Sequence, residues 1–152
     1  MKIINYFDQT KEEREYWKSE IKKCDWRAAK YLYCLLDENR LCELCGNDTK
    51  LLLLIQGKNL VSFCTLAEQD EIAARDLKPW IGFVYTFPEY RGNRYSEKII
   101  KYALEAARNA GYSNVYISSD EVGLYEKYGF QYWENMKNIY HEETQVFIYN
   151  LV

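Results

Sequence analysis

The sequence predicts one α/β domain spanning residues 1–152, with a mixed, mostly antiparallel central sheet and helices on both faces. Three observations lead to this prediction. Two apolar runs flank Gly57-Lys58, a pattern that indicates a β-hairpin. A strand, a helix and another strand follow one another between residues 80 and 119, which indicates a right-handed parallel crossover. Two helical stretches precede the hairpin and supply apolar faces to cover the sheet.

The elements before the crossover are a strand, two helices and the hairpin. Residues 2–7 are predicted to form the opening strand, and residues 11–23 and 26–36 the helices. Apolar residues recur on one side of each helix: Tyr16, Trp17 and Ile21 in the first, and Ala29, Leu32, Tyr33 and Leu36 in the second. The hairpin strands are expected at residues 51–56 and 59–67.

A polar loop at residues 68–79 leads into the crossover. Residues 80–87 are rich in β-branched and aromatic side chains and are predicted to form a buried strand. A helix over 96–110 follows, with apolar residues at helical spacing: Ile99, Ile100, Ala103, Leu104 and Ala107. The last predicted strands are short and occupy residues 115–118, 131–134 and 145–149.

The turn between the 80–87 strand and its helix carries the most informative residues. It reads Pro88-Glu89-Tyr90-Arg91-Gly92-Asn93-Arg94-Tyr95-Ser96. A turn of this kind aims backbone N–H groups and the positive end of a helix dipole at one point, which makes an anion site. Two arginines in the turn add full charges beside it. The sequence therefore predicts a cradle for a phosphate or pyrophosphate.

This turn resembles the cofactor-binding signature of the GNAT N-acetyltransferases, which transfer acetyl groups from acetyl-CoA to amines. The family pattern is Arg or Gln, two residues, Gly, one residue, then Gly or Ala. Arg91 fills the first position, whereas Arg94 stands in place of the glycine and Ser96 in place of Gly or Ala. The glycine allows close backbone approach to the pyrophosphate, and a hydroxyl at a helix N-terminus is a good cap or phosphate donor.

The resemblance implies the family's fold, in which the sheet splays between the strands at 80–87 and 114–119 and opens a cleft for the pantetheine arm. Acetyl-CoA is the implied co-substrate, and no metal is expected. Backbone groups at the end of the 80–87 strand would pair with the pantetheine amides and the thioester carbonyl. The implied cofactor-binding residues are Val84, Tyr85, Thr86, Arg91, Gly92, Asn93, Arg94, Tyr95 and Ser96.

A second block, residues 123–130, resembles the family's short C-terminal helix and turn, Leu-Tyr-x-x-x-Gly-Phe. The resemblance implies that Tyr125 is the general acid. A phenol with a pKa near 10 can protonate a departing thiolate whose conjugate pKa is about 8.5. Tyr128, beside Gly129-Phe130, is expected in the core.

The general base that takes the proton of the amine is left open. Asp120 and Glu121 follow the 115–118 strand, and Asp70 and Glu71 lie in the 68–79 loop. Glu89 belongs to the turn pattern and is discounted. A bridged water is an alternative to any of these carboxylates.

Composition narrows the partners. The net charge of −3 and pI near 5.3 argue against nucleic acid and suit an amine substrate. The N-terminus does not resemble a signal peptide and the apolar runs are too short to span a membrane, so a cytoplasmic protein is expected.

Cys42 and Cys45 form a CxxC without a second pair at zinc-site spacing, which favours packing over metal binding. His141 lies in a polar run and is expected at the surface.

The sequence-based hypothesis is an N-acetyltransferase that moves an acetyl group from acetyl-CoA to a primary amine of a small molecule or peptide, by direct attack in a ternary complex. The alternative is a non-catalytic acyl-CoA-binding or regulatory domain of the same fold. A nucleotide-binding module is disfavoured because neither GxxxxGK[ST] nor GxGxxG occurs. The acceptor amine is not identified, and a homodimer is left open.

Overall fold

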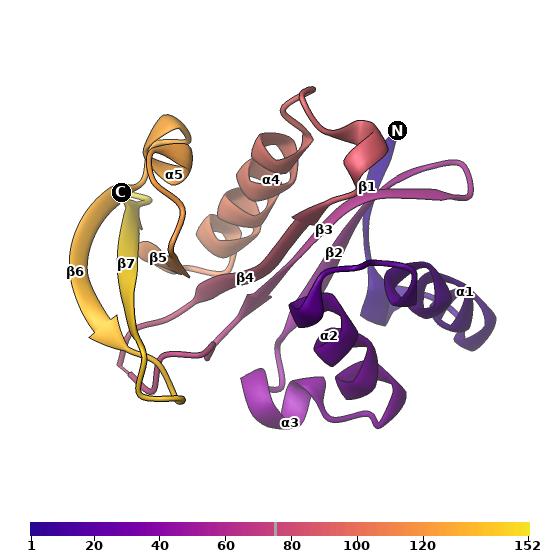
Figure 1. Cartoon of the computed structure of the whole chain (residues 1–152), viewed down its shortest axis with the longest axis horizontal. Helices are drawn as coiled ribbons and strands as arrows, with labels where there is room; N and C mark the ends of the chain where they lie inside the picture. Colours follow the sequence, from indigo (N-terminus) through magenta and orange to yellow (C-terminus); the bar gives the residue numbers. More distant parts are fainter. Residues whose placement is uncertain (75) are drawn as a thin grey trace.

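A seven-stranded mixed sheet forms the centre of the molecule (Figure 1). The computed structural model describes residues 1–74 and 76–152. The strands are β1 (Lys2–Asn5), β2 (Lys50–Gln56), β3 (Asn59–Ala67), β4 (Trp80–Thr86), β5 (Asn114–Ser119), β6 (Gln131–Lys137) and β7 (Glu143–Asn150). Their order is β1-β2-β3-β4-β5-β7-β6, with β4 and β5 parallel and the other neighbours antiparallel. The predicted mixed, mostly antiparallel sheet is confirmed.

Helices cover both faces of this sheet, as predicted (Figure 1). The helices are α1 (Lys11–Lys22), α2 (Arg27–Asp37), α3 (Leu41–Cys45), α4 (Tyr95–Asn109) and α5 (Leu124–Lys127), with 3-10 turns at Tyr6–Asp8 and Pro88–Tyr90. Residues of α1, α2 and α3 share one buried cluster with the sheet, and residues of α4 and α5 share another. We call these two sides the α1–α3 face and the α4 face.

Local signals account for most of the helix and strand boundaries. Thr10 caps α1, because its side chain accepts from the Glu13 N–H while the Glu13 carboxylate accepts from the Thr10 N–H. The opening strand is shorter than predicted: it ends at Asn5, whose side chain accepts from the Phe7 N–H and begins a 3-10 turn. The α3 helix, which contains Cys42, was not predicted.

The α4 face of the core follows the predicted helical spacing. The five apolar α4 residues are buried to at least 96%: Ile99, Ile100, Ala103, Leu104 and Ala107. In α1, Trp17 and Ile21 are buried as predicted. Tyr16 is exposed instead, and its hydroxyl donates to the Lys58 carbonyl in the turn between β2 and β3.

The parallel strands β4 and β5 diverge soon after they meet. In the described part of the chain they pair only through Trp80 with Tyr116 and Ile81 with Ile117. A β-bulge sits just beyond this point, where the register with β3 shifts and Phe83 adopts a φ of +49°. Beyond Ile81, β4 continues to pair with β3 through Gly82, Tyr85 and Thr86, while its β5 side has no described strand partner.

Candidate functional site

The turn after β4 has the backbone of an anion cradle. Gly92 has a φ of +85°, and Arg94 is the N-cap of α4 with a φ of +59°. The first N–H groups of a helix have no intrahelical acceptor, so those of Tyr95, Ser96 and Glu97 are suited to an anion. The left-handed conformation of Arg94 is one that favours glycine, since an L-residue in this region costs about 1–2 kcal/mol.

The two arginines of the turn are engaged within the chain. Arg94 donates to both carboxylate oxygens of Glu97, at 3.0 and 2.9 Å. The Arg91 Nε donates to the Thr86 carbonyl at 2.9 Å, and its guanidinium lies 5.4 Å from the centre of the Tyr85 ring. Exposed pairs of this kind contribute little stability. A phosphate can therefore displace either contact at low cost.

Hydrogen bonds and packing hold the end of β4 and the turn that follows it in place. Ser62 of β3 donates to the Tyr85 carbonyl at 2.7 Å and lies 2.9 Å from the Thr86 hydroxyl, which fixes the strand end from its β3 side. Val84 packs against the α4-face cluster. Asn93 donates to the Tyr90 carbonyl at 3.0 Å and holds the turn closed.

Ser96 does not cap α4, because the helix begins one residue earlier. Its hydroxyl instead lies 2.8 Å from the hydroxyl of Tyr128. Tyr128 was expected in the core, and its half-buried ring does pack against the α4-face cluster. The contact of its hydroxyl with α4 was not predicted. This contact joins the Arg91–Ser96 turn to the 123–130 block, which lies about thirty residues further along the chain.

Tyr125 lies on the α4 face with only 6% of its surface exposed. Its ring makes edge or tilted contacts with Tyr128, Phe130 and Phe147 at centroid distances of 6.1–6.2 Å. Burial raises the pKa of the Tyr125 hydroxyl well above its usual value, and the charge of Glu121 raises it further. A hydrogen bond from Ser119 acts in the opposite direction. The phenol is therefore protonated at neutral pH, as a proton donor must be.

The four candidate carboxylates occupy different environments. Asp120 and Glu121 are exposed at the end of β5. Asp70 and Glu71 are half-buried over the point where β4 and β5 diverge. Glu71 accepts from the Ser118 hydroxyl at 2.8 Å. Burial raises the pKa of the Asp70 carboxyl to about 6, a hydrogen bond from the Glu71 backbone acts against that rise, and the charge of Glu71 adds to it.

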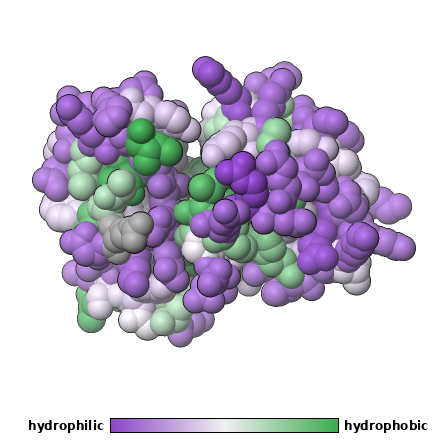
Figure 2. Space-filling view, turned by 90° about the horizontal axis from the view of Figure 1, so that it is seen from below, coloured by the Kyte–Doolittle hydropathy of each residue, from purple (hydrophilic) through white to green (hydrophobic). Residues whose placement is uncertain are grey.

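Ser118 and Ser119 link these groups at the end of β5, which pairs with β7 there and has no described pair with β4. Successive strand residues point to opposite faces of a sheet. Accordingly, Ser118 lies with Glu71 and Asp70, whereas Ser119 lies with Tyr125. The open edge between β4 and β5 thus has carboxylates on the α1–α3 face and a buried phenol on the α4 face. Figure 2 shows a notch between the half of the molecule that carries β6 and β7 and the half that carries the N-terminal helices.

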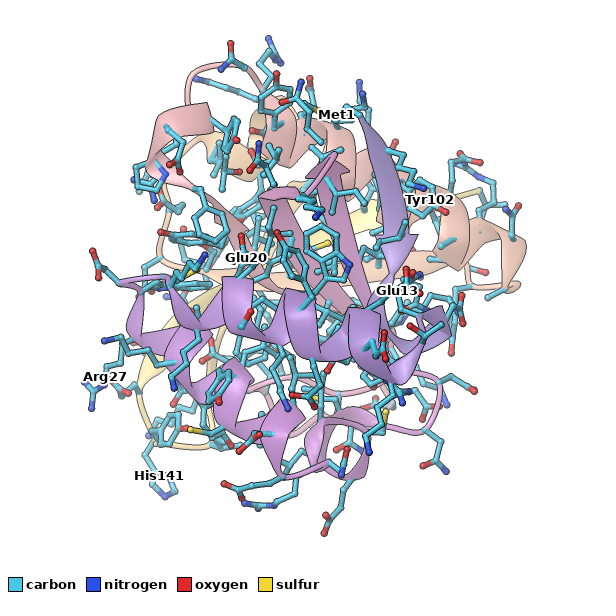
Figure 3. All side chains as sticks on the ribbon, turned by 90° about the vertical axis from the view of Figure 1, so that its right-hand side faces the viewer. Met1, Glu13, Glu20, Arg27, Tyr102 and His141 are labelled. Atoms are coloured by element: carbon cyan, nitrogen blue, oxygen red, sulfur yellow. The ribbon has the colours of Figure 1, made fainter. Side chains whose placement is uncertain are left out.

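Cys42, Cys45 and His141, which the sequence analysis singled out, occupy different environments. Cys45 is buried in the α1–α3 face, where burial raises its pKa to about 12, and Cys42 is half-buried in the same short helix. His141 is exposed between β6 and β7, and Figure 3 shows it at the edge of the molecule, as predicted. Among the described residues, no group of three or more His, Cys, Asp or Glu is arranged to hold a metal ion. No described helix is both long and apolar enough to cross a membrane.

Several solved structures share this fold. An acetyltransferase of the GNAT family from Desulfovibrio desulfuricans, described as putative, superposes with a TM-score of 0.72 at 8% identity, covering 99% of both chains. An aminoglycoside 6'-N-acetyltransferase complexed with coenzyme A gives 0.71 at 10% identity, covering 100% of this chain and 98% of that one. A Salmonella typhimurium protein, described as a putative acetyltransferase with its cofactor acetyl-CoA, gives 0.62 at 12% identity, covering 100% and 94%.

Sequence comparison gives the family directly. A search of curated protein sequences finds no significant match. The family model described as the acetyltransferase (GNAT) family, by contrast, matches residues 5–130, from the opening strand to the end of the Tyr125 block. With the seven-stranded sheet, the diverging β4 and β5, and the turn at the N-terminus of α4, this match shows that the chain belongs to the GNAT acetyltransferase family.

Proposed function

We propose that the protein transfers the acetyl group of acetyl-CoA to a primary amine of a small molecule or peptide, by direct attack in a ternary complex. One observation carries the proposal: the open edge between β4 and β5 lies next to the N-terminus of α4 and ends beside Tyr125. A thioester in that edge would have polar groups from two faces of the sheet around it.

The pyrophosphate of the cofactor is assigned to the turn from Arg91 to Ser96. Three features support this assignment: the free N–H groups of the first α4 turn, the helix dipole and the two arginines. The pantetheine arm is assigned to the β5-facing side of Val84, Tyr85 and Thr86, since the described β4–β5 pairing ends at Ile81. Relatives whose structures contain CoA or acetyl-CoA lend support, because they share this fold.

Tyr125 is proposed as the proton donor to the departing CoA thiolate. Its burial keeps the phenol protonated at neutral pH, and a phenol within hydrogen-bond reach can donate its proton to the thiolate as the C–S bond breaks. A backbone N–H at the end of β4 is proposed to stabilise the tetrahedral oxyanion, a contribution of about 3 kcal/mol in comparable sites. A non-catalytic acyl-CoA-binding domain needs no proton donor, so that alternative does not explain a phenol at this position.

The acceptor is proposed to be a small molecule or a peptide with a free amine. Three of the similar structures are described as aminoglycoside 6'-acetyltransferases or 6'-N-acetyltransferases. The carboxylates over the α1–α3 face suit a cationic ammonium group. Five free cysteines suit a reducing compartment, and we propose the cytoplasm.

Thiol release from acetyl-CoA across a panel of amines tests the function. We expect amine-dependent release by the wild-type protein and formation of the N-acetyl product by mass spectrometry. Calorimetry with CoA serves as the parallel measurement. CoA binding without release from any amine would favour the non-catalytic alternative, and absence of CoA binding would refute both.

A further inference from the structure

We propose that Asp70 is the group that takes the proton from the acceptor amine, and that Gly82 is the residue whose missing side chain makes room for the Asp70 carboxylate. This inference rests on the proposed function and assigns the base for that reaction. It follows from where the 68–79 loop meets the sheet, from the hydrogen bonds that hold it, and from the environments of the competing carboxylates.

The Asp70 carboxylate occupies the space above Gly82. A Cβ on Gly82 would lie 2.4 Å from Asp70 Oδ1 and 3.1 Å from the Thr65 hydroxyl oxygen. Gly82 is the first β4 residue beyond the last pair with β5, because that pair joins Ile81 and Ile117. The carboxylate therefore lies at the point where the two strands diverge, which is the point that a thioester between them would reach.

Asp70 and Tyr125 lie on opposite sides of that point. Ile81 packs in the same cluster as Tyr125, on the α4 face. Gly82, the next residue, faces the other side of the sheet. An acceptor amine approaching from the α1–α3 face would meet Asp70 first, while the CoA sulfur could be reached by Tyr125 from the α4 face.

The groups around Asp70 hold its loop in place. Glu71 accepts from Ser118 of β5 at 2.8 Å. The Gln69 N–H donates to the Cys45 carbonyl at the end of α3, 3.1 Å away. Among the residues that the structure describes, the titratable groups that face Asp70 are Glu71 from its own loop and the Cys45 thiol from α3.

These surroundings suit a base that works at neutral pH. Burial raises the pKa of Asp70 to about 6, so the carboxylate is mostly ionised at pH 7 and binds a proton far more strongly than an exposed aspartate does. The other two candidate bases are more exposed than Asp70. Asp120 accepts from the Thr144 hydroxyl at 3.5 Å, and Glu121 lies on the same side of the sheet as Tyr125. Neither lies where the amine is expected.

The reaction then balances with these two residues. The ammonium R–NH₃⁺ loses one proton to the Asp70 carboxylate, which later releases it to solvent. The neutral nitrogen forms a bond to the acetyl carbon, the C–S bond breaks, and the thiolate takes the proton of Tyr125. The second proton that the nitrogen loses on becoming an amide restores the phenol through solvent. The net products are the amide, CoA thiol and one proton.

The test compares Asp70→Asn with Asp120→Asn, which makes the same change at an exposed carboxylate outside the site. We expect Asp70→Asn to lower kcat/KM for an alkylamine by about 10²–10⁴ at pH 7, while CoA affinity by calorimetry stays within twofold. Asp120→Asn should keep at least half of the wild-type rate. The defect should shrink with an acceptor such as an aryl hydrazine, which is already neutral at pH 7 and needs no base.

Gly82→Ala tests independently whether the position of the Asp70 carboxylate matters for the reaction. Its Cβ would displace the carboxylate, so we expect a lower rate with the alkylamine and a smaller loss with the aryl hydrazine, at near-normal CoA affinity. Equal rates for wild type and Asp70→Asn with the alkylamine would overturn the assignment, as would an equal loss with both acceptors. A wild-type protein that binds CoA and acetylates no amine would refute the proposed function instead.

Discussion

The burial of the Asp70 carboxylate should cost the folded protein stability, and Asp70→Asn should recover it. The folded state raises the pKa of Asp70 from 3.8 to about 6. At about 1.4 kcal/mol for each pH unit, the difference corresponds to about 3 kcal/mol. Because the side chain is half-buried rather than fully enclosed, solvent screening reduces this figure, and we expect about 1–2 kcal/mol.

The sign follows from proton binding. Between pH 4 and pH 6 the folded state holds the Asp70 proton more tightly than the unfolded state does, so the free energy of unfolding falls as pH rises through this window. Above the folded pKa of about 6 the full penalty is present, and below pH 4 it is absent. Asparagine has nearly the same shape and no charge, so the variant should escape the penalty.

Urea unfolding of wild type and Asp70→Asn between pH 4 and pH 8 measures this difference. We expect the variant to be more stable at pH 7–8 and the two proteins to converge near pH 4. Asp120→Asn, an exposed carboxylate with the same substitution, should follow the wild-type curve throughout. Parallel curves for wild type and Asp70→Asn would refute the reasoning, because they would mean that the Asp70 carboxyl titrates alike in both states.

Three further predictions concern the cofactor turn and the phenol. Tyr125→Phe should lower kcat by about 10²–10⁴ in steady-state assays and leave CoA affinity unchanged, since the hydroxyl serves only the departing thiolate; a normal kcat would remove it from the mechanism. Arg91→Ala should weaken CoA binding by calorimetry, by about 1.5–3 kcal/mol for a charged hydrogen bond to phosphate, and unchanged affinity would reject that contact. Arg94→Gly should be more stable to urea than Arg94→Ala by about 1 kcal/mol, because both lose the Glu97 pair and only glycine suits the φ of +59°; equal stabilities would contradict this account.

The parts of the site that the sequence predicted are those whose geometry is local. The turn from Arg91 to Ser96 joins a strand to a helix, and both neighbours are fixed by their own periodicity. The Tyr125 block was identified by resemblance, and the fold brings it to the open end of β5. The helix after the turn was predicted at residues 96–110 and begins at Tyr95, and the short helix of the second block lies within the predicted residues 123–130.

Asp70 could not be chosen from the sequence because its environment is made by distant segments. Four carboxylates were open candidates, and nothing in the 68–79 loop distinguishes Asp70 from Glu71. The difference arises only when the loop folds over β4, so that one carboxylate lies on Gly82 and the other accepts from Ser118. Burial, and with it the pKa, is a property of that packing.

One signal for this arrangement was nevertheless present in β4. Gly82 is an isolated glycine within a run of large strand residues, and such a glycine commonly marks a bulge or the close approach of another group. The structure has both features within two residues: the Asp70 carboxylate on Gly82, and the bulge with its positive φ at Phe83. Phe83 is bulky, so its left-handed backbone costs energy that the surrounding packing must supply. The same short segment thus opens the sheet toward β5 and seats a carboxylate at the opening, which is why a glycine there is a better guide to the chemistry than any single acidic residue.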